Sequence, residues 1–332
     1  MNAVSTLGID LAKNTFSVHG VDAQGAVVVR RTVSRNKLAE LVAQLPPCLI
    51  GMEACSGAHE WARRFGSFGH TVKLMAPKFV APYRKSGKND GNDAEAICEA
   101  VTRPNMRFVP VKSVQQQADL GLHRVRQGFI EEHTGTLNRI RGLIAEFGHV
   151  LPNGPEHIRR GLPGIIDTLP ARMGRCVRDL LEHAERLAAK VREYEQEIRL
   201  GVRDNELARR AQTRQGIGPI TASALVATVG NGRDFKNGRQ FAAWLGLVPS
   251  QYSTGGKTRL GHITKRGDAY LRTLFVLGAR SVLQRAARET DPLSRWAFAL
   301  QGRRGYHRAC VAIAAKNARV AWALLAKEAE AA

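Results

Sequence analysis

The sequence contains no run of apolar residues long enough to cross a membrane. No stretch reaches the roughly 18 consecutive apolar residues that a membrane-spanning helix needs. The N-terminal MNAVSTLGIDLAKN also lacks the basic flank and apolar run of a secretion signal. We therefore expect a protein that is neither inserted into a membrane nor secreted.

Cysteine and aromatic residues are scarce as well. The chain has five cysteines, and none forms a CxxC pair: Cys48, Cys55, Cys98, Cys176 and Cys310. An odd number of scattered cysteines argues against a disulfide framework and against a zinc site, and it fits the reducing cytoplasm. Aromatic residues make up 6% of the chain, so extensive stacking of bases on aromatic rings is not indicated.

Acidic residues are outnumbered by basic ones. The 332 residues include 50 Lys and Arg against 29 Asp and Glu, a net charge of +21, while 44% of the residues are hydrophobic. A chain of this length and apolar content folds around more than one core. The charge makes nucleic acid the first partner to consider; the alternatives are an anionic membrane surface or no polyanionic partner.

The positive charge is concentrated after residue 110. Residues 1–110 hold 14 Lys and Arg against 9 Asp and Glu, whereas residues 251–332 hold 15 against 5. Contacts with a phosphate backbone are therefore expected mainly from the C-terminal two thirds.

The first 110 residues predict one mixed α/β domain. Residues 4–33 are rich in β-branched residues and contain the turn Asp22-Ala-Gln-Gly25, which indicates three antiparallel strands. Helical and strand patterns then alternate: a helix over 36–44, a strand over 48–52, a helix over 57–68, a strand over 71–75 and a helix from Pro77. This order predicts a mixed sheet with helices on both faces.

The rest of the chain is mainly helical in pattern. Residues 111–212 form a helical spacer in this interpretation, with long helices over 115–148 and from about Pro170. The second helix carries a heptad seam, which indicates either a coiled coil or an intramolecular helical hairpin. A C-terminal domain over 213–332 follows, with helices expected over 216–229, 237–246, 268–288 and 307–328.

Four acidic residues of the first domain are expected to converge. Asp10 and Glu53 end neighbouring parallel strands, and Asp90 and Asp93 share one helical face because they are three residues apart. Clustered carboxylates repel one another unless divalent cations lie between them, and oxygen ligands select Mg²⁺ or Mn²⁺. Two such ions about 3.5–4 Å apart would hold the attacking and leaving oxygens of a phosphodiester. The pattern thus predicts phosphoryl transfer.

Each carboxylate also has a structural interpretation. An Asp after a strand is commonly a turn or cap residue, and Asp90 or Asp93 could be a helix N-cap. The N-cap explains one member of that pair but not both. Asp10 and Glu53 come from apolar runs, where an uncompensated charge is costly.

Two C-terminal segments have the composition of phosphate-binding elements. Gln215-Gly-Ile-Gly-Pro219 resembles the turn of a helix-hairpin-helix, in which backbone N–H groups hold a phosphate, and Arg214, Gly216 and Gly218 are its candidate residues. Ordinary helix capping is the alternative. Residues 251–266 predict a DNA-facing loop that is rich in glycine and carries Lys257, Arg259, Lys265 and Arg266. This loop also holds the hydroxyls of Ser253 and Thr254, for which a turn role is the alternative.

These motifs together resemble a known family. GIDLAK with Asp10, GMEACSG with Glu53 and NDGNDAEAI with Asp90 and Asp93 are similar to the DEDD signature of transposases of the insertion-sequence-110 family, particularly its 1111 subgroup. The similarity continues through GIGPITASALVATVGNGRDF and GRQFAAWLGLVPSQYSTGGKTRLGHITKRGDAYLR, so it covers most of the chain.

The resemblance implies a RuvC-like, RNase H-fold catalytic domain over residues 1–110 and a metal-dependent DNA recombinase. It implies a nucleophilic serine in the C-terminal domain, for which Ser253 is the choice. Thr254 competes because the family's serine is followed by glycine, whereas this sequence reads Ser-Thr-Gly-Gly. It also implies donor and target DNA, a structured bridge RNA and a homo-oligomer, either a dimer or a tetramer.

Two other functions are compatible with the same residues. One is a RuvC-like nuclease that resolves branched DNA with a metal-activated water. The other is an architectural DNA-binding protein in which the carboxylates are structural.

Overall fold

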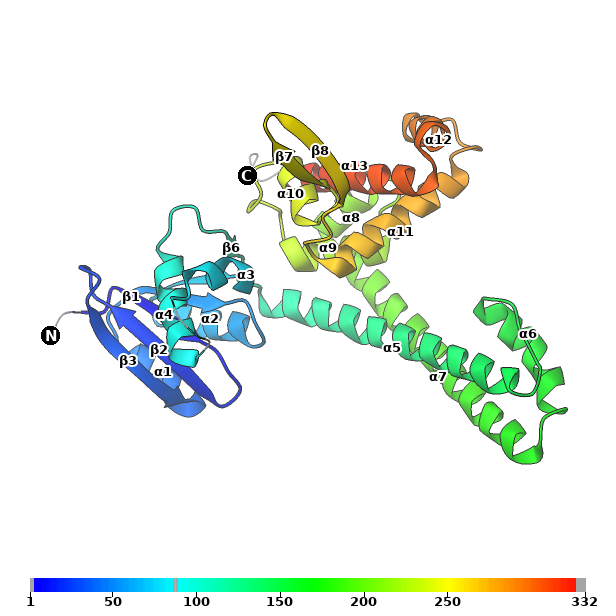
Figure 1. Cartoon of the computed structure of the whole chain (residues 1–332), viewed down its shortest axis with the longest axis horizontal. Helices are drawn as coiled ribbons and strands as arrows, with labels where there is room; N and C mark the ends of the chain where they lie inside the picture. Colours follow the sequence, from blue (N-terminus) through cyan, green and yellow to red (C-terminus); the bar gives the residue numbers. More distant parts are fainter. Residues whose placement is uncertain (1–2, 86, 88, 327–332) are drawn as a thin grey trace. The chain divides into compact units, whose positions relative to one another are not determined.

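The computed structural model describes residues 3–85, 87 and 89–326. The chain divides into two compact units, residues 1–113 and 114–332, which are described separately below (Figure 1). Residues 114–212 belong to the same unit as the C-terminal helices, and the expected boundary near residue 212 stays a prediction.

A six-stranded sheet forms the centre of the first unit, in the order β3-β2-β1-β4-β5-β6. β1, β2 and β3 are antiparallel neighbours, β4 and β5 run parallel to β1, and β6 is antiparallel to β5. The strands are β1 Thr6–Asp10, β2 Thr15–Val21, β3 Val27–Ser34, β4 Leu49–Glu53, β5 Thr71–Met75 and β6 Phe108–Val109. The sequence predicted five of these strands; the two-residue β6 is too short to leave a periodic pattern.

The turn between β2 and β3 forms as its residues predict. Asp22 Oδ1 accepts hydrogen bonds from the N–H groups of Gln24 and Ala26 at 3.0 and 2.9 Å, and Gly25 adopts a φ of 85°. Asp therefore acts here through its side chain and Gly through its freedom at positive φ.

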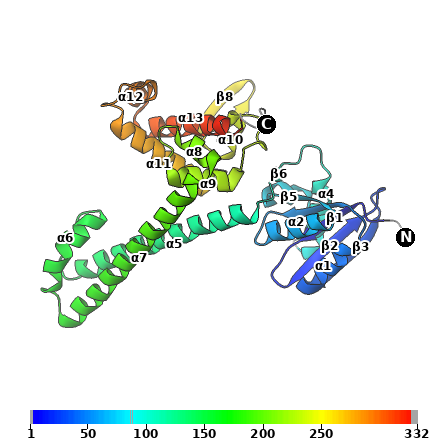
Figure 2. The same cartoon turned by 180° about the vertical axis from the view of Figure 1, so that it is seen from behind.

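Helices cover both faces of this sheet (Figure 2). On one face, Leu7 and Ile9 pack with side chains of α1 Arg35–Ala43 and α2 Ala58–Ser67, including Trp61 and Phe65. α4 Asp90–Val101 packs against β1, β2 and β4 on the other face. The short helices α3 Pro77–Val80 and η1 Ala81–Tyr83 precede α4.

Two strand glycines allow α4 to approach the sheet closely. A Cβ atom on Gly8 would lie 2.2 Å from the carbonyl oxygen of Ala94 and 2.5 Å from the amide nitrogen of Cys98. A Cβ atom on Gly51 would lie 2.8 Å from a side-chain atom of Val101. Because side chains alternate along a strand, the face that holds these glycines also receives the side chains of Asp10 and Glu53.

Three helices form the first part of the second unit. The long helices α5 Val114–Ala145 and α7 Ala171–Arg203 pack against each other, and α6 Pro155–Ile166 joins them through a core that includes Ile140, Leu162 and Val177. Several heptad positions of α7, including Val177, Ala184, Leu187 and Ile198, are buried within the chain. Of the two alternatives, a coiled coil or an intramolecular helical hairpin, this structure contains the hairpin, formed by α5 and α7.

The remaining elements of the second unit surround its largest core. The elements are α8 Glu206–Gln212, α9 Pro219–Val229, α10 Gly238–Trp244, β7 Pro249–Thr254, β8 Lys257–Ile263, α11 Ala269–Arg285, α12 Pro292–Arg304 and α13 Tyr306–Ala326. Leu225, Phe241, Phe275 and Ile313 are among the buried residues of this core.

A buried polar cluster fixes α5 to this core. The two ring nitrogens of His123 lie 3.0 Å from the hydroxyls of Tyr270 and Ser223, and Arg126 pairs with Glu195 on α7. Burial lowers the pKa of His123 to about 4, so its ring is neutral at physiological pH.

Helix α13 is long and apolar enough to cross a membrane by length and composition. Core helices of globular proteins pass the same test, and α13 buries Cys310, Ile313, Ala314 and Ala318 in the core of the second unit.

Three helices and one hairpin depart from the sequence expectation. The sequence did not predict α6, α8 or α12 as separate helices. The segment from Leu151 to Pro155 was interpreted as a break, whereas Pro155 starts α6, and Pro292 likewise starts α12. α8 lies at the end of the segment expected to be a helical spacer. The segment expected to be a DNA-facing loop contains the two antiparallel strands β7 and β8.

The close approach at Gly8 gives a testable prediction. Gly8→Ala places a methyl group against helix backbone that cannot move aside, so we expect the first unit to lose about 3 kcal/mol of unfolding free energy. Gly66→Ala in α2 is the matched control, because nothing lies within 4 Å of its Cβ position; a gain of about 0.5–1 kcal/mol is expected there. Hydrogen exchange of β1 and α4 amides measures both effects. Unchanged protection in Gly8→Ala would contradict this packing.

Candidate active site

The end of the β1–β4 pair positions the first two carboxylates. β1 and β4 are parallel, and their register pairs Ile9 with Met52. Asp10 and Glu53 are the next residues of the two strands, and both are half-buried. The parallel pairing therefore puts these two carboxylates side by side at the carboxyl edge of the sheet, on the face that α4 covers.

The first turn of α4 carries the other two carboxylates. Asp90 and Asp93 both lie in this turn, Asp90 exposed and Asp93 with 14% of its side chain exposed. The N-cap is Asn89, whose side-chain oxygen accepts a hydrogen bond of 2.8 Å from the N–H of Asn92. The capping interpretation of Asp90 or Asp93 was therefore wrong, because Asn89 already supplies the cap.

The four carboxylates interact through their charges. Burial raises the pKa of Asp10 to about 6, and the negative charges of Asp93, Glu53 and Asp90 add to the increase. Each additional negative charge near Asp10 makes its ionised form more costly. All four predicted residues thus contribute to one electrostatic cluster, which we call the acidic cluster.

Arg84 also belongs to the acidic cluster, although the sequence did not indicate it. Its Nε lies 2.5 Å from Oδ1 of Asp93, and its charge opposes the increase in the pKa of Asp10. The contact is an ion pair in which the N–H group is not aligned for a hydrogen bond. Arg84 follows η1, and no sequence motif links it to the carboxylates.

Cys55 lies near the same cluster. Partial burial and the charges of Glu53 and Asp10 raise the pKa of its thiol. A thiol with a raised pKa is a poor nucleophile at neutral pH, so Cys55 has no evident part in the chemistry.

The chemistry of the donor set fits a hard divalent cation. The cluster offers four carboxylates, and the burial of Asp10 beside the charges of Asp93, Glu53 and Asp90 raises its pKa to about 6, which a nearby cation would counter. As they lie, however, no three Asp, Glu, His or Cys side chains in the described part of the chain converge on one metal position. Arg84 already pairs with Asp93, so ligation by Asp93 requires this ion pair to open.

The glycine turn before α9 is packed into the second unit. Gly216 has a φ of 88°, and a Cβ atom there would lie 2.8 Å from Nδ2 of Asn317 and 3.1 Å from the carbonyl oxygen of Gly278. Arg214 donates a hydrogen bond of 2.7 Å from Nε to the side-chain oxygen of Asn317. A Cβ atom on Gly218, in contrast, would meet nothing within 4 Å. Close packing thus explains why residue 216 is a glycine. The space beside Gly218, at the start of α9, is unoccupied by other atoms of the described residues.

Ser253 and Thr254 lie on β7 in the second unit. Ser253 is paired with Thr258 and Thr254 with Lys257. Ser253 is exposed, and its hydroxyl accepts a hydrogen bond of 2.7 Å from the side-chain amide of Gln251. Lys257 and Arg259 are exposed on β8, and Lys265 and Arg266 follow it.

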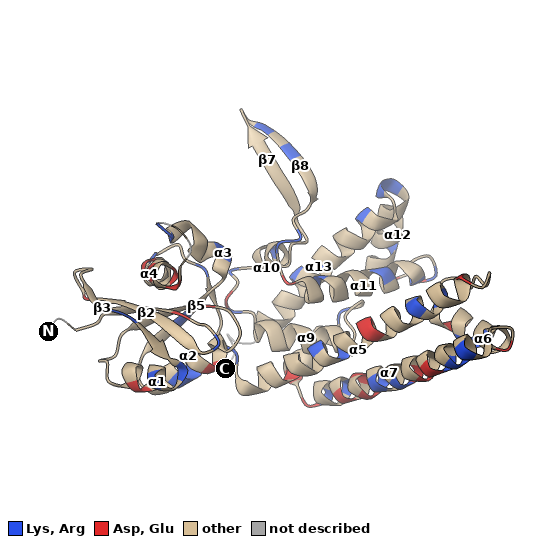
Figure 3. Cartoon of the chain, turned by 60° about the horizontal axis from the view of Figure 1, so that its bottom comes forward, with Lys and Arg blue, Asp and Glu red and all other residues tan. Residues whose placement is uncertain are grey.

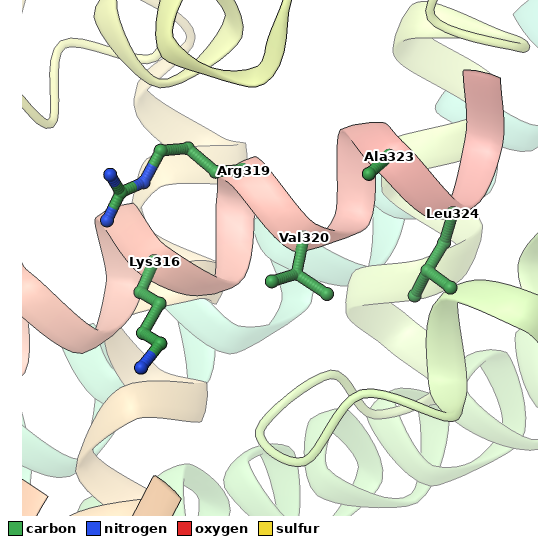
Figure 4. A pocket seen from close by; sticks show the side chains of 5 residues that line it. All are labelled: Lys316, Arg319, Val320, Ala323 and Leu324. Carbon is green, nitrogen blue, oxygen red and sulfur yellow. The ribbon is translucent and has the colours of Figure 1, made fainter. Parts of the chain in front are cut away.

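A pocket of about 510 Å³ lies on α13 in the same unit and is lined by Lys316, Arg319, Val320, Ala323 and Leu324 (Figure 4). It contains none of the predicted site residues. Its two cations lie beside an apolar surface of Val320, Ala323 and Leu324.

Two protein families match this chain, one over the acidic cluster and one over the segment that holds Ser253. Residues 7–148, which include the acidic cluster, match a family described as "Transposase" with the DEDD domain of IS110 elements. Residues 208–293, which include Ser253, match the family described as "Transposase IS116/IS110/IS902 family". The chain belongs to this family of transposases.

Full-length relatives of this transposase carry matching names. It is 48% identical to a "Probable family 20 transposase" of Pseudomonas aeruginosa, over 98% of each chain. It is 41% identical to the "Transposase for insertion sequence element IS1328" of Yersinia enterocolitica, over 97% of each chain. It is 40% identical to the IS1111A transposase of Coxiella burnetii, over 99% of this chain and 91% of that one. The sequence-based resemblance is thereby confirmed.

Membership settles the broad function. The chain is a DNA transposase, an enzyme whose partner is DNA, and its DEDD domain indicates dependence on a divalent metal. The mixed α/β sheet of the first unit is consistent with an RNase H-like fold.

The raised pKa of Asp10 predicts a pH dependence of stability. Its folded pKa of about 6 exceeds the usual 3.8, so its contribution to stability is lost as the pH rises through this interval. Without divalent cations, Asp10→Asn should therefore raise the melting temperature by roughly 3–5 °C at pH 7.5, and by much less at pH 4.5. Thermal unfolding at both pH values measures this.

Glu60→Gln is the control for Asp10→Asn, because Glu60 is an exposed acid whose ion pair with Arg63 contributes little. An equal stabilisation by Asp10→Asn at both pH values would contradict the assigned repulsion.

Proposed function

We propose that this transposase cleaves and rejoins donor and target DNA by metal-dependent phosphoryl transfer through a serine nucleophile. The observation that carries the proposal is the acidic cluster, in which burial and the charges of Asp93, Glu53 and Asp90 raise the pKa of Asp10 to about 6. Neighbouring, partly buried negative charges are costly without a counter-ion, so this arrangement supports a cation bound at the edge of the sheet. The RuvC-like version of the RNase H fold is part of this proposal, and the strand order supports it.

Asp10, Glu53, Asp90 and Asp93 would hold Mg²⁺ or Mn²⁺. When bound, the metal supplies polarisation of the scissile phosphodiester and compensation of the charge that develops on it. The protein's own contribution is placement: the parallel register of β1 and β4 fixes two carboxylates, and the first turn of α4 provides the other two.

Ser253 is the proposed nucleophile. Its oxygen would form a bond to phosphorus as it loses its proton, while the bond between phosphorus and the leaving DNA oxygen breaks and that oxygen is protonated. A covalent phosphoserine joined to DNA results. The exposure of Ser253 supports the assignment, since a DNA backbone can reach it. Thr254 has the same exposure and remains the competing nucleophile.

The phosphate backbone would be held by basic and glycine residues of the second unit: Arg214, Gly216, Gly218, Lys257, Arg259, Lys265 and Arg266. Residues 111–332 carry most of the net positive charge, which supports this placement of DNA contacts. Gly218 is better suited than Gly216 to approach a phosphate, because the space beside it is open.

A structured bridge RNA would select the DNA sites, and the enzyme would act in the cytoplasm as a homo-oligomer, a dimer or a tetramer. The family resemblance supports this, together with a basic chain that has few aromatic residues. The RNA part fails if the purified protein carries no specific RNA and if element-encoded RNA does not alter DNA binding.

The proposal predicts a covalent protein–DNA adduct. Labelled donor and target DNA incubated with protein, RNA and Mg²⁺ should give an adduct that survives denaturation. Ser253→Ala should abolish it, whereas Thr254→Ala should retain it. An adduct that survives Ser253→Ala and disappears in Thr254→Ala would transfer the nucleophile to Thr254. Hydrolysed ends without an adduct would indicate a nuclease, and no Mg²⁺-dependent product would indicate an architectural protein.

The carboxylates are tested in the same assay. Asp10→Ala and Glu53→Ala should each reduce adduct formation by at least about a thousandfold while sparing DNA binding, because they remove charge stabilisation of the transition state. Circular dichroism separates this result from misfolding. Normal adduct formation in either variant would contradict the assigned role.

A further inference from the structure

The β7–β8 ribbon, residues Pro249–Ile263, projects from the helices of the second unit (Figures 1 and 3). Every residue from Gln251 to His262 is exposed, on both faces of the ribbon. The exposed residues include Tyr252 and Leu260, with 72% and 66% of their surface accessible. A two-stranded ribbon with neither face covered is marginally stable alone in water, so its exposed faces are suited to a partner.

The strand register divides the ribbon into two chemically different faces. Tyr252 is paired with Arg259 and Thr254 with Lys257, so these four residues share what we call the basic face. Gln251 is paired with Leu260 and Ser253 with Thr258, and these four residues share the opposite face, here called the serine face. The hydrogen bond from Gln251 to Ser253 agrees with this division.

The charge of the ribbon is of one sign. Residues 249–266 contain no Asp or Glu, and Figure 3 shows Lys and Arg along β8. On the ribbon itself, Lys257 and Arg259 both lie on the basic face, beside the exposed ring of Tyr252. The basic face therefore complements a polyanion, while the serine face carries neutral side chains.

The base of the ribbon is held firmly, so its direction is fixed within the second unit. Gly246 has a φ of 73°, and a Cβ atom there would lie 2.7 Å from the amide nitrogen of Arg266. Arg272 on α11 donates hydrogen bonds to the carbonyl oxygens of Leu245 and Gly267. A rigid base and an uncovered tip are what an element needs in order to insert into a groove.

The tip is narrow. Gly255 and Gly256 form the two-residue turn with φ values of 56° and 76°, as a hairpin turn with two positive φ angles requires. Nothing lies within 4 Å of a Cβ atom at either glycine. The end of the ribbon is thus only two strands wide and free of side-chain bulk.

We propose that the ribbon lies in the major groove of duplex DNA with its basic face against the DNA, and that the serine face points away from this contact. This inference rests on the proposed function, since it concerns how the proposed recombinase holds its DNA. The hydroxyl of Ser253 is then separated from the binding surface by the thickness of the ribbon, so the DNA segment that Ser253 attacks is not the segment that the basic face holds.

The dimensions favour DNA over duplex RNA. Neighbouring strands are about 4.8 Å apart, so a two-stranded ribbon with its side chains fits the major groove of B-form DNA, which is about 12 Å wide. The major groove of A-form RNA is deep and too narrow for side chains to read. A groove-bound ribbon should therefore distinguish these two duplexes.

The test compares the two faces in the full-length protein. Fluorescence anisotropy with a labelled duplex of about 30 base pairs, roughly three helical turns, measures affinity over a series of salt concentrations with EDTA present. Lys257→Thr and Arg259→Gln should each weaken binding about tenfold and lower the salt slope by about 0.9 for each phosphate that the variant no longer neutralises. Gln251→Ala and Thr258→Ala, on the serine face, should bind as the wild type does.

A swap variant provides the matched control for charge. Combining Lys257→Thr with Thr258→Lys keeps the composition and net charge of the ribbon but moves one cation from the basic face to the serine face. We expect this variant to bind as weakly as Lys257→Thr alone. If it binds as tightly as the wild type, the attraction is independent of the face and the proposal is wrong.

An RNA duplex of the same length completes the test. The basic-face variants should weaken RNA binding much less than they weaken DNA binding, because only the general attraction to phosphates is lost; an equal reduction for RNA and DNA would overturn the assignment to the major groove. The adduct assay separates this inference from the proposed function. If the wild-type protein forms the Ser253 adduct but the basic-face variants bind DNA as tightly as it does, the groove contact is wrong and the proposed function stands.

Discussion

The burial of Asp10 beside three other carboxylates is the constraint on which the first unit depends. Burial raises the pKa of Asp10 to about 6, and the negative charges of Asp93, Glu53 and Asp90 add to this increase. Gathering these charges destabilises the fold, and a loss of stability of this kind is typical of active sites. Arg84 compensates part of the charge through its ion pair with Asp93, and a divalent cation would compensate the rest.

The cluster requires a sheet and a helix that lie unusually close together. Gly8 and Gly51 have no side chains on the face that α4 covers, so the helix backbone rests almost directly on β1 and β4. Asp10 and Glu53 follow these glycines on the same face, two residues further along each strand. The second unit keeps its functional groups apart instead of gathering them. On the β7–β8 ribbon, the strand register places Lys257 and Arg259 on one face and the hydroxyl of Ser253 on the other.

Much of the first unit could be predicted from its sequence, because β-branched strands and alternating helices leave a periodic pattern. The four carboxylates could also be predicted, since Asp10 and Glu53 end apolar runs and Asp90 and Asp93 are three residues apart. Arg84 could not, because only the chain path after η1 brings it to Asp93. The β7–β8 hairpin was interpreted as a loop because glycines and exposed polar residues hide the alternation that a half-buried strand displays.

The central claim, that the acidic cluster exists to share a divalent cation, is tested most directly by Mn²⁺ binding measured through the electron paramagnetic resonance of free Mn²⁺. The account predicts that Asp10→Asn, Glu53→Gln and Asp93→Asn each weaken binding by on the order of tenfold or more. The exposed Glu40→Gln should bind as the wild type does. Unchanged Mn²⁺ affinity in Asp10→Asn and Glu53→Gln would contradict the account.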